Sequence, residues 1–285
     1  MLTDIYDPKA LTATLMPLGF RFSKARGQSF LIDPAVPAAM ARHLPPRARA
    51  LEIGPGPGAL TRALLQDAEA VVAIESDATL AAFLGGELEG ESKLILLHAD
   101  AVKTDLGALA RQHSLAVACG NLPYAVTTPL LTALLRAGEY GVMLLMVQRE
   151  VAQRLVSPPG SRVYGAFTVF ARVYCESEIL FTVPPESFFP RPLVTSAVIR
   201  LTRRPRPLVR DDDAARFFAL VRAAFAHRRK TLANSLSASL GVCKETVAQQ
   251  LRRAGIDPNA RAETLDIPQF LAAAAQRATE GGDAG

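Results

Sequence analysis

Apolar and polar residues follow two different patterns along the first two hundred residues of the chain. Short continuous apolar runs predict buried strands, and we expect these at 48–53, 70–75, 94–98, 115–119 and 141–148. The segments between them carry apolar residues at helical spacing, which predicts helices at 59–67, 78–88, 106–112 and 128–137. Strands that alternate with helices are typical of βαβ units. The pattern therefore indicates an α/β fold whose parallel sheet is covered by helices on both faces.

Shorter elements flank this alternation. Asp7-Pro8 and Asp33-Pro34 each combine an N-cap residue with a proline suited to a first helical turn, so we expect a short helix after each pair. A helix is also expected at 150–156, followed by a Pro-Gly turn and the apolar segment 167–174. Two strands at 176–183 and 195–201 are then expected to pair at the far edge of the sheet.

The segment Arg203-Arg204-Pro205-Arg206-Pro207 breaks the pattern and predicts a linker. Beyond it the chain is expected to be wholly helical, with helices at 214–226, 230–240, 244–254 and 268–278. We therefore expect a larger α/β domain over residues 1–204 and a small all-helical domain over residues 205–285.

Composition narrows the class of protein. The 285 residues are 49% hydrophobic and 21% charged, as in an ordinary globular protein, and the net charge of +5 permits a polyanionic partner. Three isolated cysteines without a CxxC pair indicate neither a zinc site nor a disulfide framework, so no metal is expected and a reducing, cytoplasmic location is the simplest. Neither an apolar run long enough to span a membrane nor a signal peptide is apparent, so we expect no membrane association.

A glycine-rich turn, Glu52-Ile53-Gly54-Pro55-Gly56-Pro57-Gly58, follows the first strand of the alternation and opens a helix. Gly54 and Gly56 let the backbone approach a ligand, and Glu75 at the end of the next strand lies near the ~20-residue spacing expected of a ribose-binding carboxylate. The turn is G-x-G-x-G rather than the G-x-G-x-x-G of a dinucleotide site, and Glu52 would repel a pyrophosphate. An adenosine-bearing cation without phosphate, such as S-adenosylmethionine, fits better. The alternative is a glycine-rich turn that has only a structural role and binds no ligand.

Two further positions follow strands of the same sheet. Asp100 could accept a hydrogen bond from an adenine amino group, although an N-cap role would explain an isolated Asp as well. Asn121-Leu122-Pro123-Tyr124 offers an amide oxygen, a backbone carbonyl and an aromatic ring, which suit a planar exocyclic amine. A tight turn explains the Asn and Pro equally well when the tetrapeptide is taken alone.

Seven motifs in order resemble the rRNA adenine N6,N6-dimethyltransferases, and most closely the KsgA/RsmA family of bacterial small-subunit (16S) enzymes. The likeness runs from about residue 18 to 270 and rests on 27–31 (GQSFL), 52–58 (EIGPGPG), 121–124 (NLPY), 148–151 (QREV), 188–196 (FFPRPLVTS), 228–232 (RRKTL) and 261–265 (RAETL). The chain departs from the family pattern at Ser29, Ala125 and Arg191, where the family usually has Asn, Asn or His, and Pro.

The resemblance implies a Rossmann-like class I methyltransferase sheet of seven mostly parallel strands, with a small helical C-terminal domain. It implies S-adenosylmethionine as cofactor, converted to S-adenosylhomocysteine, with contacts at Gln28, Ser29, Leu31, Gly54, Gly56, Glu75, Asp100 and Asn121. It places the chemistry at Asn121, Leu122, Pro123 and Tyr124, with Phe188 covering the other face of the base.

The implied reaction is dimethylation of the N6 amino groups of two adjacent adenosines in a hairpin loop near the 3′ end of small-subunit rRNA, linked to ribosome biogenesis. The expected partner is small-subunit rRNA in a pre-ribosomal small subunit, bound by a monomer. The basic residues expected to contact RNA are Arg203, Arg204, Arg228, Arg229 and Lys230.

Other functions remain open at the level of sequence. A large-subunit rRNA adenine methyltransferase shares most of these motifs, although the last two favour the small-subunit enzymes. A DNA N6-adenine methyltransferase uses a similar Asn/Asp-Pro-Pro-Tyr turn, but Leu122 and the helical C-terminal region count against it. A non-catalytic rRNA-binding assembly factor would not need Glu75, Asp100 and Asn121 together, and a nicotinamide oxidoreductase is disfavoured by the glycine spacing.

Overall fold

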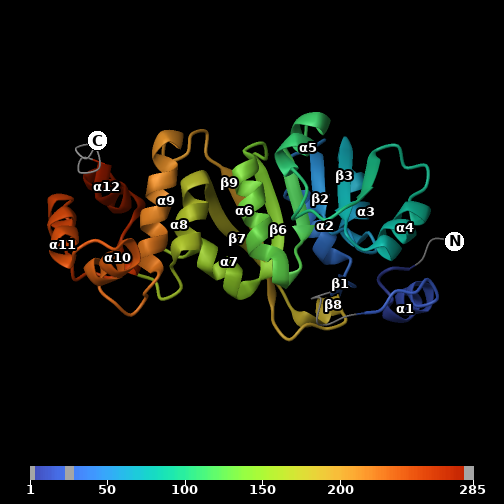
Figure 1. The fold of residues 1–285 in the computed structure, drawn as a ribbon. Helices are drawn as coiled ribbons and strands as arrows, with labels where there is room; N and C mark the ends of the chain where they lie inside the picture. Colours follow the sequence, from blue (N-terminus) through green and yellow to red (C-terminus); the bar gives the residue numbers. More distant parts are fainter. Residues whose placement is uncertain (1–3, 23–28, 279–285) are drawn as a thin grey trace. The chain divides into compact units, whose positions relative to one another are not determined.

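The computed structural model describes residues 4–22 and 29–278 (Figure 1). The chain forms two compact units, one made of Met1–Ala152 and Ser177–Arg203, the other of Gln153–Glu176 and Arg204–Gly285. The division near residue 204 lies one residue from the boundary that the linker predicts. The difference is that residues 153–176 belong with the helical unit, although the sequence analysis assigned them to the α/β domain.

The first unit is built on a seven-stranded sheet in the order β4-β3-β2-β5-β6-β9-β7, as expected of a Rossmann-like fold. The strands are β2 (Arg49–Ile53), β3 (Ala70–Glu75), β4 (Leu94–His98), β5 (Val117–Asn121), β6 (Val142–Gln148), β7 (Cys175–Val183) and β9 (Ser196–Arg203). The strands β2 to β6 pair in parallel, and β9 runs antiparallel to β6. The two late strands, β9 and β7, close one edge of the sheet, where the sequence predicts a strand pair.

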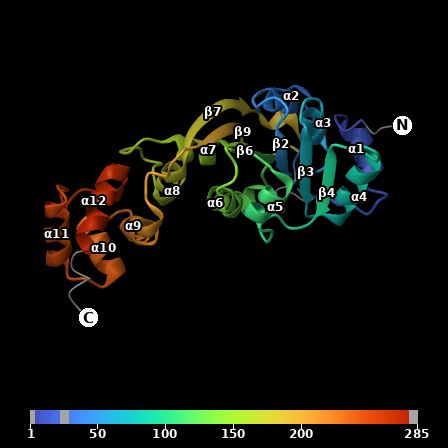
Figure 2. The same ribbon diagram turned by 90° about the horizontal axis from the view of Figure 1, so that it is seen from above.

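Helices cover both faces of this sheet. The helices of the first unit are α1 (Pro8–Leu15), α2 (Ala35–Arg42), α3 (Ala59–Leu65), α4 (Ala78–Glu87), α5 (Leu106–His113), α6 (Thr127–Ala137) and α7 (Arg149–Val156), the last of which runs into the second unit. Figure 2 shows α2 and α3 on one face and α5 and α6 on the other. The central strands are apolar on both sides because both sides are covered, and Leu51, Val71 and Met143 have no exposed surface.

A second, two-stranded sheet joins distant parts of the chain at the end of the first unit where the parallel strands terminate. β1 (Phe30–Leu31) pairs antiparallel with β8 (Phe188–Phe189), with Leu31 opposite Phe188. The aromatic rings of Phe22 and Phe30 pack beside it, with ring centroids 5.9 Å apart. This pairing brings the 27–31 and 188–196 motifs together.

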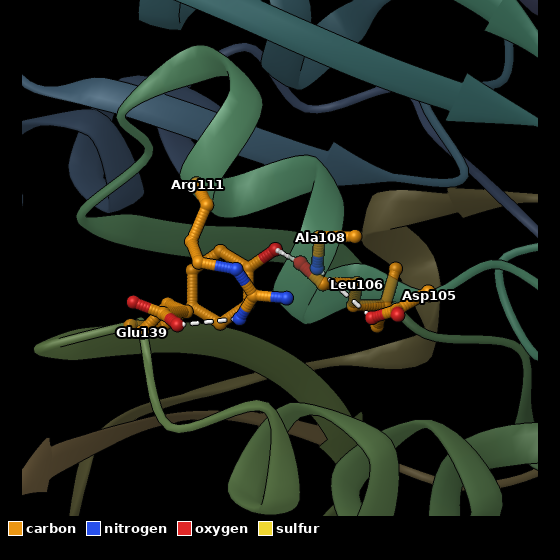
Figure 3. A network of polar contacts seen from close by, with 6 residues as sticks. Asp105, Leu106, Ala108, Arg111 and Glu139 are labelled. Atoms are coloured by element: carbon orange, nitrogen blue, oxygen red, sulfur yellow. Dashed lines mark hydrogen bonds and ion pairs between the residues drawn. The ribbon is translucent and has the colours of Figure 1, made fainter.

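Polar contacts hold α5 against the start of β6 (Figure 3). Asp105 caps α5 by accepting a 2.9 Å hydrogen bond from the Ala108 amide, and Arg111 pairs with Glu139 at 2.7 Å. The buried Tyr140 hydroxyl donates to the Leu106 carbonyl at 2.8 Å. Because Arg111 and Glu139 are largely exposed, their pair contributes little, and the buried Tyr140 bond is the firmer of these links.

The second unit is helical, as predicted for the C-terminal region. It contains α8 (Ala166–Tyr174), α9 (Asp211–Phe225), α10 (Leu232–Leu240), α11 (Lys244–Arg253) and α12 (Ile267–Ala278). Its core gathers apolar side chains from all five helices, among them Val169 of α8 and Phe217 of α9. The shared core explains why α8 belongs here, since its apolar face packs with the C-terminal helices. Among the described residues, no helix combines the length and apolar character that crossing a membrane requires.

Candidate active site

A cavity of about 290 Å³ lies at the carboxyl ends of β2, β3 and β5. The chain leaves β2 towards β3 on one side, and β5 is the neighbour of β2 on the other side. This is the switch point of the sheet, where open α/β folds bind ligands. Eight of the predicted site residues line the cavity: Ser29, Gly54, Gly56, Glu75, Asn121, Leu122, Pro123 and Tyr124.

The glycine turn and the carboxylate of Glu75 form one wall of the cavity. Glu75 Oε2 accepts a 3.0 Å hydrogen bond from the Gly56 amide, and Oε1 accepts a 2.9 Å bond from the Asp77 amide. Gly56 has a φ of 55°, and a Cβ there would lie 3.1 Å from the ring of Phe30. The turn thus requires glycine for both its conformation and its close approach to the ring.

Burial raises the pKa of Glu75, and the amides that bond it oppose that rise. The carboxylate is nevertheless fixed in place by two backbone donors, one from the turn after β2 and one from the turn after β3. A carboxylate held this way at the end of β3 is a suitable acceptor for ribose hydroxyls.

Glu52, one residue from the end of β2, is 1% exposed. Burial raises its pKa to about 8, with contacts to Thr61 opposing the rise and the charge of Glu75 adding to it. Neither Glu52 Oε2 nor the Thr61 hydroxyl has a well-formed hydrogen bond within the described part of the chain, so burial is the dominant cause. The residue that the sequence analysis treated as a negative charge is therefore mostly protonated at neutral pH. That weakens the argument that Glu52 repels a pyrophosphate.

Asn121 ends β5 with its side chain at the cavity. Its amide nitrogen donates a 3.0 Å hydrogen bond to the backbone carbonyl of Ser29. The other end of the amide, Oδ1, is thereby assigned as the acceptor available to a ligand. A Cβ on the preceding residue, Gly120, would lie 2.4 Å from the carbonyl oxygen of Ile53, so β5 approaches β2 here more closely than any side chain allows.

The rest of the tetrapeptide is held by backbone and side-chain contacts. The Leu122 amide donates to the Met146 carbonyl at 3.0 Å, and the Pro123 carbonyl accepts from the Val126 amide at 3.1 Å. The hydroxyl of Tyr124 lies 3.1 Å from that of Ser196. These hydrogen bonds hold the turn in one conformation, with Asn121 and Tyr124 at the cavity.

Three predicted residues do not line the cavity. Leu31 and Phe188 are buried and face each other across the β1–β8 pair. Asp100 accepts a 2.9 Å bond from the Val102 amide and pairs with Lys103 at 3.7 Å. These bonds to neighbouring residues fit the N-cap role considered for Asp100, and they do not show a ligand contact. Gln28 lies outside the described residues.

Other residues line the cavity although the sequence analysis did not select them as site residues: Phe30, Ser76, Asp77, Leu80, Ala125 and Val126. Asp77 caps α4 by accepting bonds from the Thr79 and Leu80 amides. Its position two residues after Glu75, at a strand-to-helix junction, is the signal that could have selected it.

The predicted RNA-contacting arginines divide into two groups. The Arg203 guanidinium donates to the carbonyls of Leu135 and Tyr140, at 2.7 and 3.2 Å. Arg204 donates to the Arg172 carbonyl at 3.1 Å and pairs with Glu176. These guanidinium groups are engaged within the protein. The predicted RNA-contacting residues of the segment between α9 and α10 are exposed: Arg228, Arg229 and Lys230. Of these, Arg228 also donates to the Arg162 carbonyl.

The fold and this cavity define a class I S-adenosylmethionine-dependent methyltransferase. The profile of the ribosomal RNA adenine dimethylase family matches residues 19–278. The ribosomal RNA small subunit methyltransferase A of Geobacillus kaustophilus (strain HTA426) is 42% identical over 282 residues, which cover 95% of this chain and 96% of the relative. The chain belongs to the ribosomal RNA adenine dimethylase family.

Solved structures agree in fold. The 23S rRNA methyltransferase ErmE is 26% identical, with a TM-score of 0.66 over 87% of this chain and 98% of its own. A dimethyladenosine transferase from Plasmodium falciparum is 24% identical, with a TM-score of 0.76 over 88% of this chain and 98% of its own. The fold class expected from the sequence is confirmed.

Proposed function

We propose that this chain dimethylates the N6 amino groups of two adjacent adenosines in a hairpin loop near the 3′ end of small-subunit rRNA. The identity of 42% to a small-subunit methyltransferase, against 26% to the 23S rRNA enzyme ErmE, favours the small subunit as substrate. The 228–232 and 261–265 motifs point the same way. We further propose that the enzyme acts as a cytoplasmic monomer on an assembling small subunit, linked to ribosome biogenesis.

The residues at the cavity fit S-adenosylmethionine. The glycine turn leaves room that a Cβ at Gly56 would fill, and the Glu75 carboxylate at the end of β3 is placed for ribose hydroxyls. Ser29 and Gly54 would complete this side of the site. When bound, the cofactor supplies an electrophilic methyl group on a sulfonium.

Asn121 is the residue proposed to accept a hydrogen bond from the adenine amino group. The exocyclic nitrogen of adenine is a poor nucleophile because its lone pair is delocalised into the ring. Accepting its N–H bonds draws the nitrogen towards tetrahedral geometry and localises that lone pair. The observation that carries the proposal is the Asn121–Ser29 hydrogen bond, because it engages the amide nitrogen and leaves the acceptor atom Oδ1 available to a ligand.

The Leu122 carbonyl is proposed as the second acceptor and Tyr124 as the stacking surface for the base. Stacking of a base on an aromatic ring is worth about 1–3 kcal/mol. No general base is needed before transfer, since the methylated product can lose its proton to water, and positioning supplies most of the acceleration. A monomethylated base has one N–H left, so the second transfer has to proceed with one of the two acceptors unpaired.

The target base must leave its stack to reach the cavity, which a hairpin loop makes easier. The exposed cations Arg228, Arg229 and Lys230 are proposed to grip phosphates. Arg203 and Arg204 stay predictions as RNA contacts, because their guanidinium groups already bond within the protein.

Transfer of tritiated methyl groups to small subunits that lack the modification tests this function, with large subunits and DNA as controls. We expect label in small-subunit rRNA alone, as N6,N6-dimethyladenosine. Asn121→Ala should abolish transfer while retaining S-adenosylmethionine binding, measured by calorimetry. Label in large-subunit rRNA alone, or near-normal transfer by the variant, would contradict the proposal.

A further inference from the structure

A buried serine on the antiparallel strand contacts the aromatic end of the catalytic turn. Ser196 is the first residue of β9, has no exposed surface, and lies opposite Gln148 of β6 in the sheet. Its hydroxyl is 3.1 Å from that of Tyr124. The carbonyl of the preceding residue, Thr195, accepts a 3.0 Å bond from the Arg149 amide, so the backbone is bonded at this position as well. The Tyr124 hydroxyl is thus bonded to a side chain that is itself immobilised by the sheet.

The near end of Tyr124 is held separately. Pro123 has a φ of −58°, and its carbonyl accepts hydrogen bonds from the Val126 amide at 3.1 Å and the Thr127 hydroxyl at 3.0 Å. A tyrosine side chain has only two rotatable bonds between its backbone and its ring. Cβ, the ring axis and the hydroxyl oxygen lie on one line, so fixing the backbone at one end and the hydroxyl at the other fixes the direction of that axis. The O–H bond and the lone pair of a conjugated phenol oxygen lie in the ring plane, so the bond to Ser196 also favours one rotation of the ring about the axis.

We propose that Ser196 is a positioning residue: it holds the axis of the Tyr124 ring and favours the ring orientation on which the adenine stacks. The role rests on the proposed function, because Tyr124 lines the cavity and would contact the base, whereas Ser196 acts through Tyr124. It also gives a role to the last residue of the 188–196 motif, whose first residue, Phe188, is buried and does not line the cavity.

A purely structural role for Ser196 makes different predictions. A buried hydroxyl needs a hydrogen-bond partner, and Tyr124 supplies one whatever the ring does in catalysis. If that were all, removing the serine hydroxyl would lower stability and slow methylation only through unfolding. A positioning role requires that the two hydroxyl groups act as one unit in methyl transfer.

The contact is tested first in the free protein. Tyrosine labelled with ¹³C at Cζ reports hydrogen bonding of the phenol, and the chain has only five tyrosines, so Tyr124→Phe identifies its signal. Ser196→Ala should shift that signal and leave the other four in place. Ser157→Ala is the matched control, because Ser157 is also buried but bonds the Arg154 carbonyl. An unmoved Tyr124 signal in Ser196→Ala would overturn the proposal.

A double-mutant cycle then tests the role in catalysis. Ser196→Ala and Tyr124→Phe should each lower kcat/KM for small-subunit methylation by about tenfold, the loss expected for one hydrogen bond. The double variant should lose no more than either single one, since both remove the same bond. The Kd for S-adenosylmethionine should stay within about twofold of the wild-type value with full binding stoichiometry, whereas a folding defect would lower that stoichiometry.

Two failures are distinguishable in this cycle. If the wild-type enzyme methylates adenine but the losses in kcat/KM of the two single variants multiply in the double variant, the role of Ser196 is overturned and the proposed function stands. A wild-type enzyme that transfers no methyl group to rRNA adenine would overturn the proposed function, and the role of Ser196 with it.

Discussion

The amide nitrogen of Asn121 donates to the backbone carbonyl of Ser29, across 3.0 Å and from a distant part of the sequence. The bond uses the amide nitrogen of Asn121 and leaves its oxygen, Oδ1, as the acceptor available at the cavity. Because it uses the carbonyl of Ser29, it does not depend on the side chain that departs from the family pattern at this position.

Asn121→Asp tests the orientation of the side-chain amide, because Asp has nearly the same size and shape as Asn. The carboxylate has no N–H for the Ser29 carbonyl, and one of its oxygens would face that carbonyl unfavourably. We expect methyl transfer to fall by about a hundredfold or more, the effect typical of one positioned polar group at a reacting centre. Single-turnover rates measure it. Ser29→Ala, which retains the carbonyl, should lose far less; equal losses in the two variants would show that the amide orientation is not set by this bond.

Glu52 should make folding stability depend on pH. Its pKa is about 8 in the folded protein, against a usual value of 4.5. Between those values the folded state keeps a proton that the unfolded state has lost. The contribution of Glu52 to the free energy of unfolding is therefore greatest below pH 4.5. It falls by up to about 1.4 kcal/mol per pH unit as the pH rises towards 8, and it is constant above that.

Glu52→Gln mimics the protonated acid and should remove this dependence. Urea unfolding at pH 5 and pH 8 measures it: the variant should gain stability relative to wild type as the pH is raised. A constant difference between the two proteins across that range would show that Glu52 titrates as an ordinary carboxylate.

Gly120→Ala should disrupt the sheet at the cavity. The added Cβ would lie 2.4 Å from the Ile53 carbonyl, so β2 and β5 must separate. We expect a loss of at least about 1–3 kcal/mol in unfolding free energy and a strong loss of methylation. Gly86→Ala is the control, because nothing lies within 4 Å of its Cβ and it sits in α4. That variant should be slightly more stable than wild type, by about 0.5–1 kcal/mol.

The two groups of basic residues should respond differently to substitution. Replacing Arg229 and Lys230 by Ala should weaken rRNA binding and reduce the slope of log K against log salt by about 0.7–0.9 per lost phosphate contact. Arg203→Ala should instead lower stability by about 1–3 kcal/mol, because it leaves the carbonyls of Leu135 and Tyr140 without their donor. Filter binding over a range of salt concentrations and thermal unfolding distinguish these outcomes. An Arg203→Ala variant with a reduced salt slope and full stability would assign that residue to the RNA.

Local pattern was enough to predict the α/β unit. The parallel strands are continuous apolar runs, such as Val71 to Ile74, and the helices between them begin at recognisable caps such as Asp77 and Asp105. These signals depend only on neighbours in the chain, so they are visible in the sequence. The glycine turn, Glu75 and Asn121 then follow as residues at strand ends.

Contacts between distant segments were beyond the sequence. The β1–β8 pair has two residues per strand, too few for any periodicity. Its register sets Leu31 opposite Phe188, and both side chains are buried outside the lining of the cavity. The helix α8 belongs to the second unit because Val169 and Val173 pack into its core, which no boundary signal marks. The Tyr124–Ser196 contact is of the same kind.

The register of β2 on β5 places Glu52 opposite Cys119, so the two turns that follow these strands emerge side by side, and a Cβ on Gly54 would lie 4.0 Å from the Asn121 carbonyl. The spacing between the glycine turn and the Asn121 turn is then one strand spacing, about 4.8 Å, fixed by main-chain bonding rather than by side chains. Substitutions in the loops around the cavity can change its walls without changing the distance between these two turns. That distance is inherited with the sheet.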